Sequence, residues 1–151
     1  MRTLLSVGVS ALLTLASPAV FSAEKIEEPA LAFSVDDPRL EWAPCPDFLP
    51  AGCAIAVLHG DPAQPNVDIF FKVPAGSKVP NHTHTSAERM VLVSGNLEVT
   101  YQGQAPVALT PGTYAYGPAS KPHTAVCADG EPCVLFIAFE DPLDAMPVEA
   151  P

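Results

Sequence analysis

Short apolar runs, each closed by a turn signal, follow one another through the chain after residue 41. Several alternate strictly between apolar and polar side chains, which is the period of a strand with one buried face. Eighteen prolines and nine glycines lie scattered between the runs, and no segment has the period of an ordinary helix. We therefore predict an all-β domain, an antiparallel sandwich or barrel. The expected strands cover residues 54–59, 67–73, 89–93, 97–101, 107–109, 113–116, 123–127 and 133–139.

The first 23 residues have the layout of a secretory signal peptide. Arg2 precedes an apolar stretch, and the small residues Ser22 and Ala23 offer a cleavage site. The apolar core is shorter than the ~20 residues that span a bilayer, and Pro18 interrupts it, so we favour cleavage over a membrane anchor. We expect a secreted or periplasmic protein. Its parts would be the signal peptide at 1–23, an arm at 24–41, the barrel domain at 42–141 and a tail at 142–151.

Acidic residues outnumber basic ones. The formal charge of the 151 residues is −10, and loss of the signal peptide with its single arginine makes it −11. Such an excess of acid argues against binding to nucleic acid or to an anionic membrane surface. We expect the partner to be a small molecule.

The chain has four cysteines, Cys45, Cys53, Cys127 and Cys133. An even number in an exported chain predicts disulfides, for which three connectivities are possible. We favour the local pairs Cys45–Cys53 and Cys127–Cys133, because a turn-rich segment separates each pair and would close the second one across a hairpin. A thiolate metal site is the alternative, but the spacings are too long for paired C-x2-C ligands.

Three histidines and a glutamate form a candidate metal site. His82 and His84 are two residues apart, a spacing that points both side chains to one face of a strand. Glu88 precedes the next strand, and His123 begins a later one. Imidazoles with a carboxylate suit a divalent first-row metal such as Mn, Fe, Co, Ni, Cu or Zn. A His-x-His pair alone is more often just a polar strand face.

Two spaced motifs decide between these interpretations. In the first, five residues separate Gly76 from His82-Thr-His84, three precede Glu88, and six precede Gly95. This matches every position of the first motif of the cupin superfamily, so the chain resembles a cupin.

The second cupin motif has its match at residues 112–127. Gly112, Pro118 and His123 keep the family's spacing. Two positions differ from the family motif: Ser120 stands in place of Gly, and Cys127 stands in place of Asn. The turn before His123 is therefore expected to differ in shape. Neither position is a ligand in the family. The lead-in to these motifs is also similar to that of a group of bacterial cupins.

The resemblance implies a jelly-roll β-barrel with one divalent metal ion in its mouth, held by His82, His84, Glu88 and His123. It also implies pairing into a homodimer. The metal of a cupin has one or two coordination positions that no protein ligand occupies. This favours an enzyme of the dioxygenase-like, isomerase or lyase type that acts on a small oxygenated molecule. A non-enzymatic binding or sensor protein is the alternative. A structural metal is the least favoured, because such sites close their coordination with four Cys or His ligands.

Alternation within the strands predicts which side chains line the barrel. Met90, Leu92, Leu97 and Val99 are expected on the apolar wall, together with Tyr101, Tyr114 and Tyr116. Tyr101 and Tyr116 are the candidate catalytic residues, because a phenol can donate a proton or bind an oxyanion. His59 lies outside both motifs and is expected at the surface.

Overall fold

The computed structural model describes residues 27–149, and its chain divides into two compact units, Met1–Leu31 and Ala32–Pro151. Residues 27–31, the described part of the first unit, form no helix or strand. The signal peptide predicted at 1–23 lies outside the described residues. Within residues 27–149 there is no helix with the length and apolar character needed to span a membrane. All that follows concerns the second unit.

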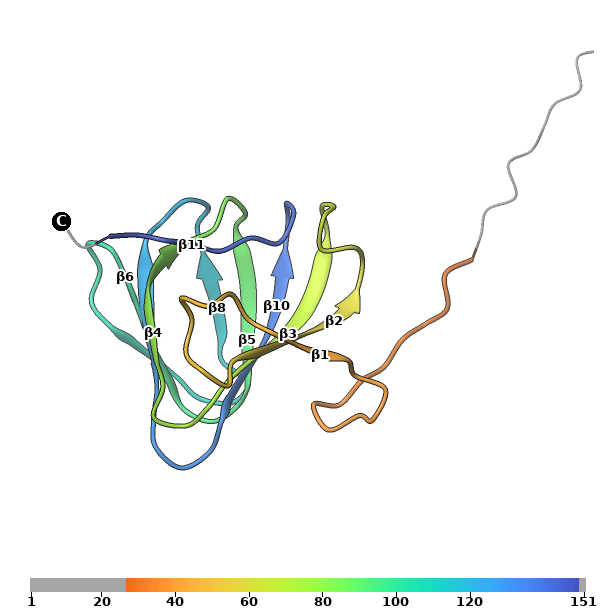
Figure 1. The fold of residues 1–151 in the computed structure, drawn as a ribbon, viewed down its shortest axis with the longest axis horizontal. Coiled ribbons are helices and arrows are strands. Elements are labelled where there is room, and N and C mark those ends of the chain that lie inside the picture. Colours follow the sequence, from red (N-terminus) through yellow and green to blue (C-terminus); the bar gives the residue numbers. More distant parts are fainter. Residues whose placement is uncertain (1–26, 150–151) are drawn as a thin grey trace, which may run out of the picture. The chain divides into compact units, whose positions relative to one another are not determined.

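Two antiparallel sheets build the second unit (Figure 1). The six-stranded sheet has the order β1 (Trp42–Pro44), β2 (Ala54–His59), β3 (Val67–Val73), β10 (Cys133–Phe139), β5 (Glu88–Ser94) and β8 (Tyr114–Gly117). The five-stranded sheet has the order β11 (Met146–Pro147), β4 (Lys78–Thr83), β9 (His123–Cys127), β6 (Leu97–Tyr101) and β7 (Val107–Leu109). The eight expected strands are all present, and the all-β jelly-roll prediction is confirmed.

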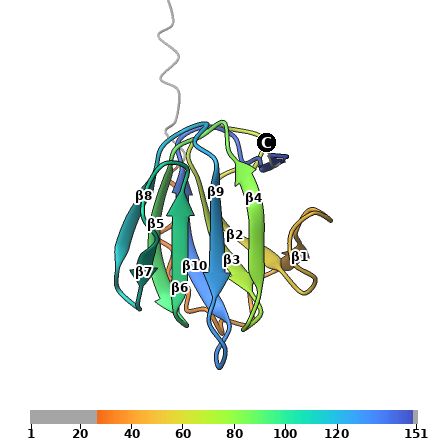
Figure 2. The ribbon, with the colours of Figure 1, turned by 90° about the vertical axis from the view of Figure 1, so that its left-hand side faces the viewer.

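The two sheets face each other, and the core fills the space between them (Figure 2). Leu97 and Val99 on β6 point inwards, as do Met90 and Leu92 on β5, and each of them is at most 6% exposed. Burial of one such side chain contributes about 1.5–3 kcal/mol relative to its exposed state. No hydrogen-bonded strand pair joins the sheets among the described residues, so the barrel is not closed by strand pairing.

The outer face of the six-stranded sheet carries a second, smaller apolar cluster. Trp42 packs here on the edge strand β1, with the Lys72 ammonium 3.9 Å from its ring centroid. Part of the segment that the sequence analysis treated as an arm therefore packs on the sheet. The buried members are Ala56, Phe70 and Val134, and the partly buried ones from the arm are Phe33, Val35 and Leu40.

Both predicted disulfides are present. Cys45–Cys53 closes the loop between β1 and β2, with its Cα atoms 5.5 Å apart. Cys127–Cys133 has a Cα–Cα separation of 5.8 Å. The expected hairpin around this second pair is wrong, because β9 pairs with β4 and β6 whereas β10 pairs with β3 and β5. The Cys127–Cys133 bond therefore joins the two sheets.

Candidate metal site

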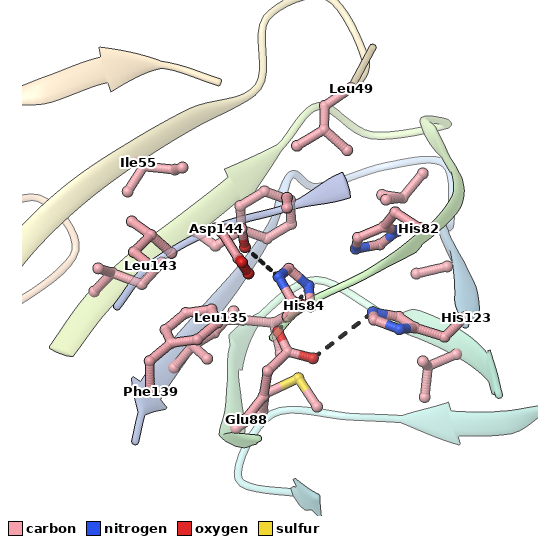
Figure 3. Close-up of a pocket in the computed structure, with 18 of the residues that line it drawn as sticks. Leu49, Ile55, His82, His84, Glu88, His123, Leu135, Phe139, Leu143 and Asp144 are labelled. Atoms are coloured by element: carbon pink, nitrogen blue, oxygen red, sulfur yellow. Dashed lines mark hydrogen bonds and ion pairs between the residues drawn. The ribbon is translucent and has the colours of Figure 1, made fainter. Parts of the chain in front are cut away.

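Three buried histidines meet at one end of the five-stranded sheet (Figure 3). His82 on β4 lies directly opposite His123 on β9 in the strand register. His84 follows the last residue of β4, and its ring centroid is 4.9 Å from that of His82. One ligand nitrogen from each of the three rings lies within 4.8 Å of the others. The cross-strand pairing of β4 and β9 thus brings together residues that are 41 positions apart in the sequence.

A backbone carbonyl fixes the orientation of each imidazole. The Nδ1 of His82 is 2.8 Å from the Pro80 oxygen, and the Nδ1 of His123 is 3.1 Å from the Lys121 oxygen. The Nδ1 of His84 bonds to the oxygen of Asp144. A carbonyl oxygen can only accept, so each Nδ1 carries the proton and donates it. Each Nε2 then has a free lone pair, which is the state that binds a metal.

Glu88 faces the histidines from the opposite sheet. It begins β5, where its register partners are Phe139 on β10 and Gly117 on β8. Its Oε1 is 3.3 Å from the Nε2 of His84, and its Oε2 is 3.7 Å from the Nε2 of His123. Only 4% of Glu88 is exposed. The structure therefore brings together all four residues that the sequence predicts as ligands.

The donor separations suit a single metal ion. Bonds of about 2.1 Å put neighbouring donors about 3.0–3.4 Å apart, and opposite donors of an octahedron about 4.2 Å apart. The carboxylate–imidazole distances of 3.3 and 3.7 Å, and nitrogens within 4.8 Å of one another, lie close to these values.

Burial sets the charge of these groups. It lowers the pKa of His82 to about 4 and that of His123 to about 3, because a buried imidazolium loses its hydration. Burial also raises the pKa of Glu88, for the same reason applied to a carboxylate. Neutral imidazoles at neutral pH are ready to bind a cation, and a cation would offset the cost of burying the Glu88 charge.

Tyr101 packs against the ring of His123 on the neighbouring strand. It is the register partner of His123, and the two ring centroids are 4.8 Å apart. Its hydroxyl is buried and has no hydrogen-bond partner among the described residues. A Cβ added to Gly117 would collide with this hydroxyl and lie 2.8 Å from the Glu88 Oε2. Both oxygens therefore lie beside Gly117, where only a glycine leaves them room.

Tyr116 is not part of the site, and the prediction that it lines the barrel is wrong. It is 51% exposed on the edge strand β8, and Tyr114 on the same face is 59% exposed. Ala115 and Gly117 take the inward positions, next to Met90 and Glu88 of β5. The sequence suggested the opposite phase because aromatic residues usually take the buried face of a strand. His59 is exposed on β2, as expected.

The turn before His123 keeps a glycine-like shape without a glycine. Ser120 has a φ of 58°, in the left-handed region that the glycine of the cupin motif adopts readily. Its amide donates to the carbonyl oxygen of His84 at 2.8 Å. This bond ties the turn to the His-x-His segment.

The segment after β10 supports the site, a role that the sequence did not indicate. Besides binding His84 through its carbonyl, Asp144 accepts from the backbone amide of Thr85 at 2.9 Å and from the Thr85 hydroxyl at 2.6 Å. The hydroxyl of Ser86 accepts from the amides of Glu140 and Asp141. β11 then pairs with β4 beside His82. The only signal in the sequence was an Asp in a proline-rich segment, a pattern too common to mark Asp144 as a residue of the site.

A cavity of about 250 Å³ opens from the four residues into the barrel. Its cover includes Pro46 and Leu49 from the disulfide-closed loop, and Asp144 from the C-terminal segment (Figure 3). The ring of Phe48, on the same loop, is 6.3 Å from that of His82. The wall is otherwise apolar, as expected, and includes Met90, Leu97, Val99, Leu109, Leu135, Ile137 and Phe139.

Solved structures with the same fold include several enzymes. The chain aligns with the DMSP lyase DddQ from Ruegeria pomeroyi DSS-3 at 21% identity and a TM-score of 0.63, over 72% of this chain and 61% of the lyase. It aligns with the polyketide cyclase RemF from Streptomyces resistomycificus at 19% identity and a TM-score of 0.63, over 80% of this chain and 88% of the cyclase. An RmlC-like cupin protein from Ralstonia eutropha JMP134 aligns at 22% identity and a TM-score of 0.58, over 74% of this chain and 69% of that protein. The chain thus spans about three fifths of the lyase.

No curated protein matches the sequence. A family model does, and its match covers both motifs, the four clustered residues and part of the arm that packs on the sheet. The match runs over residues 32–141, well over half of the chain, and the family is described as the ChrR cupin-like domain. The chain therefore belongs to the ChrR cupin-like domain family, within the cupin superfamily.

Proposed function

We propose that the chain is a metal-dependent enzyme that binds one divalent first-row metal ion through His82, His84, Glu88 and His123 and acts on a small oxygenated molecule. One observation carries the proposal: backbone carbonyls hold all three Nδ1 protons and leave each Nε2 with a free lone pair, and the Nε2 atoms of His84 and His123 face the Glu88 carboxylate at the head of a cavity. Such second-sphere bonds accompany histidines that bind metals.

The cavity favours catalysis over a purely structural metal. A structural ion is usually surrounded by four protein ligands in a closed shell. Here the four donors border an open space of about 250 Å³, so a substrate oxygen has room to reach the same point. A bound divalent metal would supply Lewis-acid chemistry and acidify a bound water.

One further group of this chain can hold a proton beside that point. Burial and the nearby Glu88 charge raise the pKa of Tyr101, so its hydroxyl stays protonated and can donate. That hydroxyl lies next to Glu88, whose own pKa is raised. A protonated phenol beside the four residues favours proton transfer of the isomerase or lyase type, and we place Tyr101 in the role of candidate proton donor. Dioxygenase-like chemistry is the second possibility. Proteins of similar fold are named as a DMSP lyase, a polyketide cyclase and an oxalate decarboxylase.

We further propose that the protein is exported after cleavage near Ser22 or Ala23, that its barrel domain covers residues 42–141 with a tail at 142–151, and that it forms a homodimer. Two disulfides support an oxidising compartment. The partner is a small molecule, not nucleic acid or a membrane, which agrees with the formal charge of −10.

Elemental analysis of protein purified from its native compartment should find one first-row metal ion per chain. After substitution by cobalt, azide and acetate should change the visible spectrum, because each can take an open coordination position. If the cobalt spectrum responds to no added ligand and shows four protein donors without water, the site is structural and the enzyme proposal fails. If ligands bind but no turnover is found in a broad screen of isomerase, lyase and dioxygenase substrates, a binding or sensor protein becomes the better description.

A further inference from the structure

The cavity beside the four clustered residues offers few polar groups. Of the 21 residues that line it, 16 are apolar, and none is Ser, Thr, Asn, Gln, Lys or Arg. The five others are the four proposed metal ligands and Asp144. A ligand therefore meets one polar end and a long apolar wall.

Asp144 is already occupied. Its two carboxylate oxygens accept from the amide and the hydroxyl of Thr85, and its carbonyl oxygen accepts from His84. No hydrogen-bonding side chain in the wall is left to receive a second polar group of a ligand. A hydroxyl or charge placed there would lose its hydration without compensation, at a cost that rules out tight binding.

We infer that the cavity takes a ligand with one oxygen-donor head and an otherwise apolar body, such as a medium-chain carboxylate or a hydrocarbon-rich ketone. The part of this inference that concerns the head rests on the proposed function, because the head would bind at the proposed metal. Polyols, sugar acids and dicarboxylates are excluded. A volume of about 250 Å³ corresponds to roughly eight waters at ~30 Å³ each, so the ligand must be small.

The direction of the apolar body follows from two side chains. Ile55 and Leu143 line this cavity and also a groove on the surface that contains Arg39 and Trp42. No other residue is common to the two hollows, so Ile55 and Leu143 form the wall between them. Figure 3 places these two across the cavity from His82 and His123. A ligand with its head at the histidines thus extends its body towards Ile55 and Leu143.

Straight-chain carboxylates test the inference on the cobalt-substituted protein, with the visible spectrum as the readout. Each added methylene should tighten binding about three- to fourfold, so hexanoate should bind on the order of a hundredfold more tightly than acetate. Gluconate, with six carbons and five hydroxyls, should bind no more tightly than acetate. Equal affinities of acetate and hexanoate, or tighter binding of gluconate than of hexanoate, would overturn the inference.

Two variants locate the body of the ligand. Leu143→Trp and Ile55→Trp each fill the far end of the cavity, and both positions are only partly buried, so the fold should tolerate them. In both variants the affinity for acetate should be unchanged, whereas the affinity for octanoate should fall at least tenfold. Val57→Trp adds the same bulk on the same strand outside the cavity and should change neither. Unchanged octanoate binding in both cavity variants would refute the assigned direction.

The same titrations separate this inference from the proposed function. If no carboxylate changes the cobalt spectrum, acetate included, the open coordination position is missing and the proposed function fails. If acetate changes the spectrum but chain length has no effect, the proposed function stands and the ligand class inferred here is wrong.

Discussion

At each histidine of the candidate site, a backbone carbonyl holds the proton on Nδ1 and leaves Nε2 with a free lone pair. The three carbonyls belong to Pro80, Asp144 and Lys121, so the ring orientations depend on the backbone rather than on other side chains. A bound metal would therefore meet donors that are already oriented, and loss of a ring should remove a ligand without rearranging the others.

The first prediction concerns these ligands directly. The double variant His82→Ala/His84→Ala, and His123→Ala alone, should lose most of the bound metal, measured as ions per chain by elemental analysis. Glu88→Gln should keep some metal but with at least about tenfold lower affinity, because an amide is a weaker donor than a carboxylate. His59→Ala, the matched control at an exposed position, should keep the full stoichiometry. An unchanged stoichiometry in the double variant would rule out the proposed site.

The backbone conformation of Ser120 has a measurable effect on stability. Its φ of 58° costs a non-glycine residue about 1 kcal/mol or more, whereas glycine adopts it freely. Ser120→Gly should therefore raise the free energy of unfolding by about 0.5–1 kcal/mol, after the greater freedom of glycine in the unfolded chain is subtracted. Chemical denaturation measures the change. Ser120→Val should destabilise the protein, and if both variants lower its stability, the strain at this position has been misjudged.

The C-terminal segment contacts the candidate site although it lies outside the strands that carry the predicted ligands. Its carbonyl at Asp144 orients His84, its carboxylate holds Thr85, and β11 continues alongside β4. The segment is therefore part of the candidate metal site although it supplies no predicted ligand.

Asp144→Ala should lower metal affinity about 10–100-fold, the usual range for a lost outer-sphere contact, because the carbonyl that orients His84 is no longer anchored to Thr85. A competition titration with a chelator of known affinity measures the change. The control is Asp141→Ala, whose described contact with Ser86 runs through its backbone amide and survives the substitution. Equal affinities in the two variants would show that the segment does not position His84.

The disulfide-closed loop between β1 and β2 gives a second prediction at this scale. Cys45→Ala/Cys53→Ala opens a loop of sequence separation 8, which should lower the free energy of unfolding by about 2–3 kcal/mol through the entropy of the unfolded chain. The same change should speed exchange of carboxylates at the cobalt site, since Leu49 and Pro46 cover the cavity. Denaturation and stopped-flow measurements report the two effects. An unaltered exchange rate would mean that the loop is no part of the cover.

Strand positions were predictable from the sequence wherever alternation and turn residues were clear, as in β3, β6 and β10. The strand β11 was not, because it contains only Met146 and Pro147 and owes its existence to pairing with β4. The phase of β8 was predicted wrongly, because the small residues Ala115 and Gly117 face the core beside Glu88 and Tyr116 faces out. Packing against neighbouring strands decided these cases, and local pattern does not carry that information.

For the whole molecule, we predict a homodimer. The edge strand β8 presents Tyr114 and Tyr116 to solvent, and tyrosines are enriched in protein interfaces. Light scattering at micromolar concentration should give twice the chain mass, and Tyr114→Glu/Tyr116→Glu should give the monomer. Val107→Glu is the control, at an exposed position on β7, the edge of the other sheet. A monomer mass for the unaltered protein would contradict the prediction.

The candidate site as a whole was predictable only in part. The two motifs identify His82, His84, Glu88 and His123, because donor spacing along the strands survives in the sequence. Gly117 carries no comparable signal, since its importance lies in the space it leaves for Tyr101 and Glu88 on other strands. Asp144 is likewise 60 residues from the His84 that it orients. Contacts of this kind appear only when the two sheets are assembled.

Because the donors come from both sheets, no single hairpin of this protein can form the site, and a metal ion would bind only the folded chain. Free metal at a hundredfold excess over its dissociation constant would then add about 2.7 kcal/mol to the free energy of unfolding. A chain deprived of metal would unfold more often and be degraded sooner. The abundance of the protein would follow the supply of its metal, with no regulator needed to couple the two.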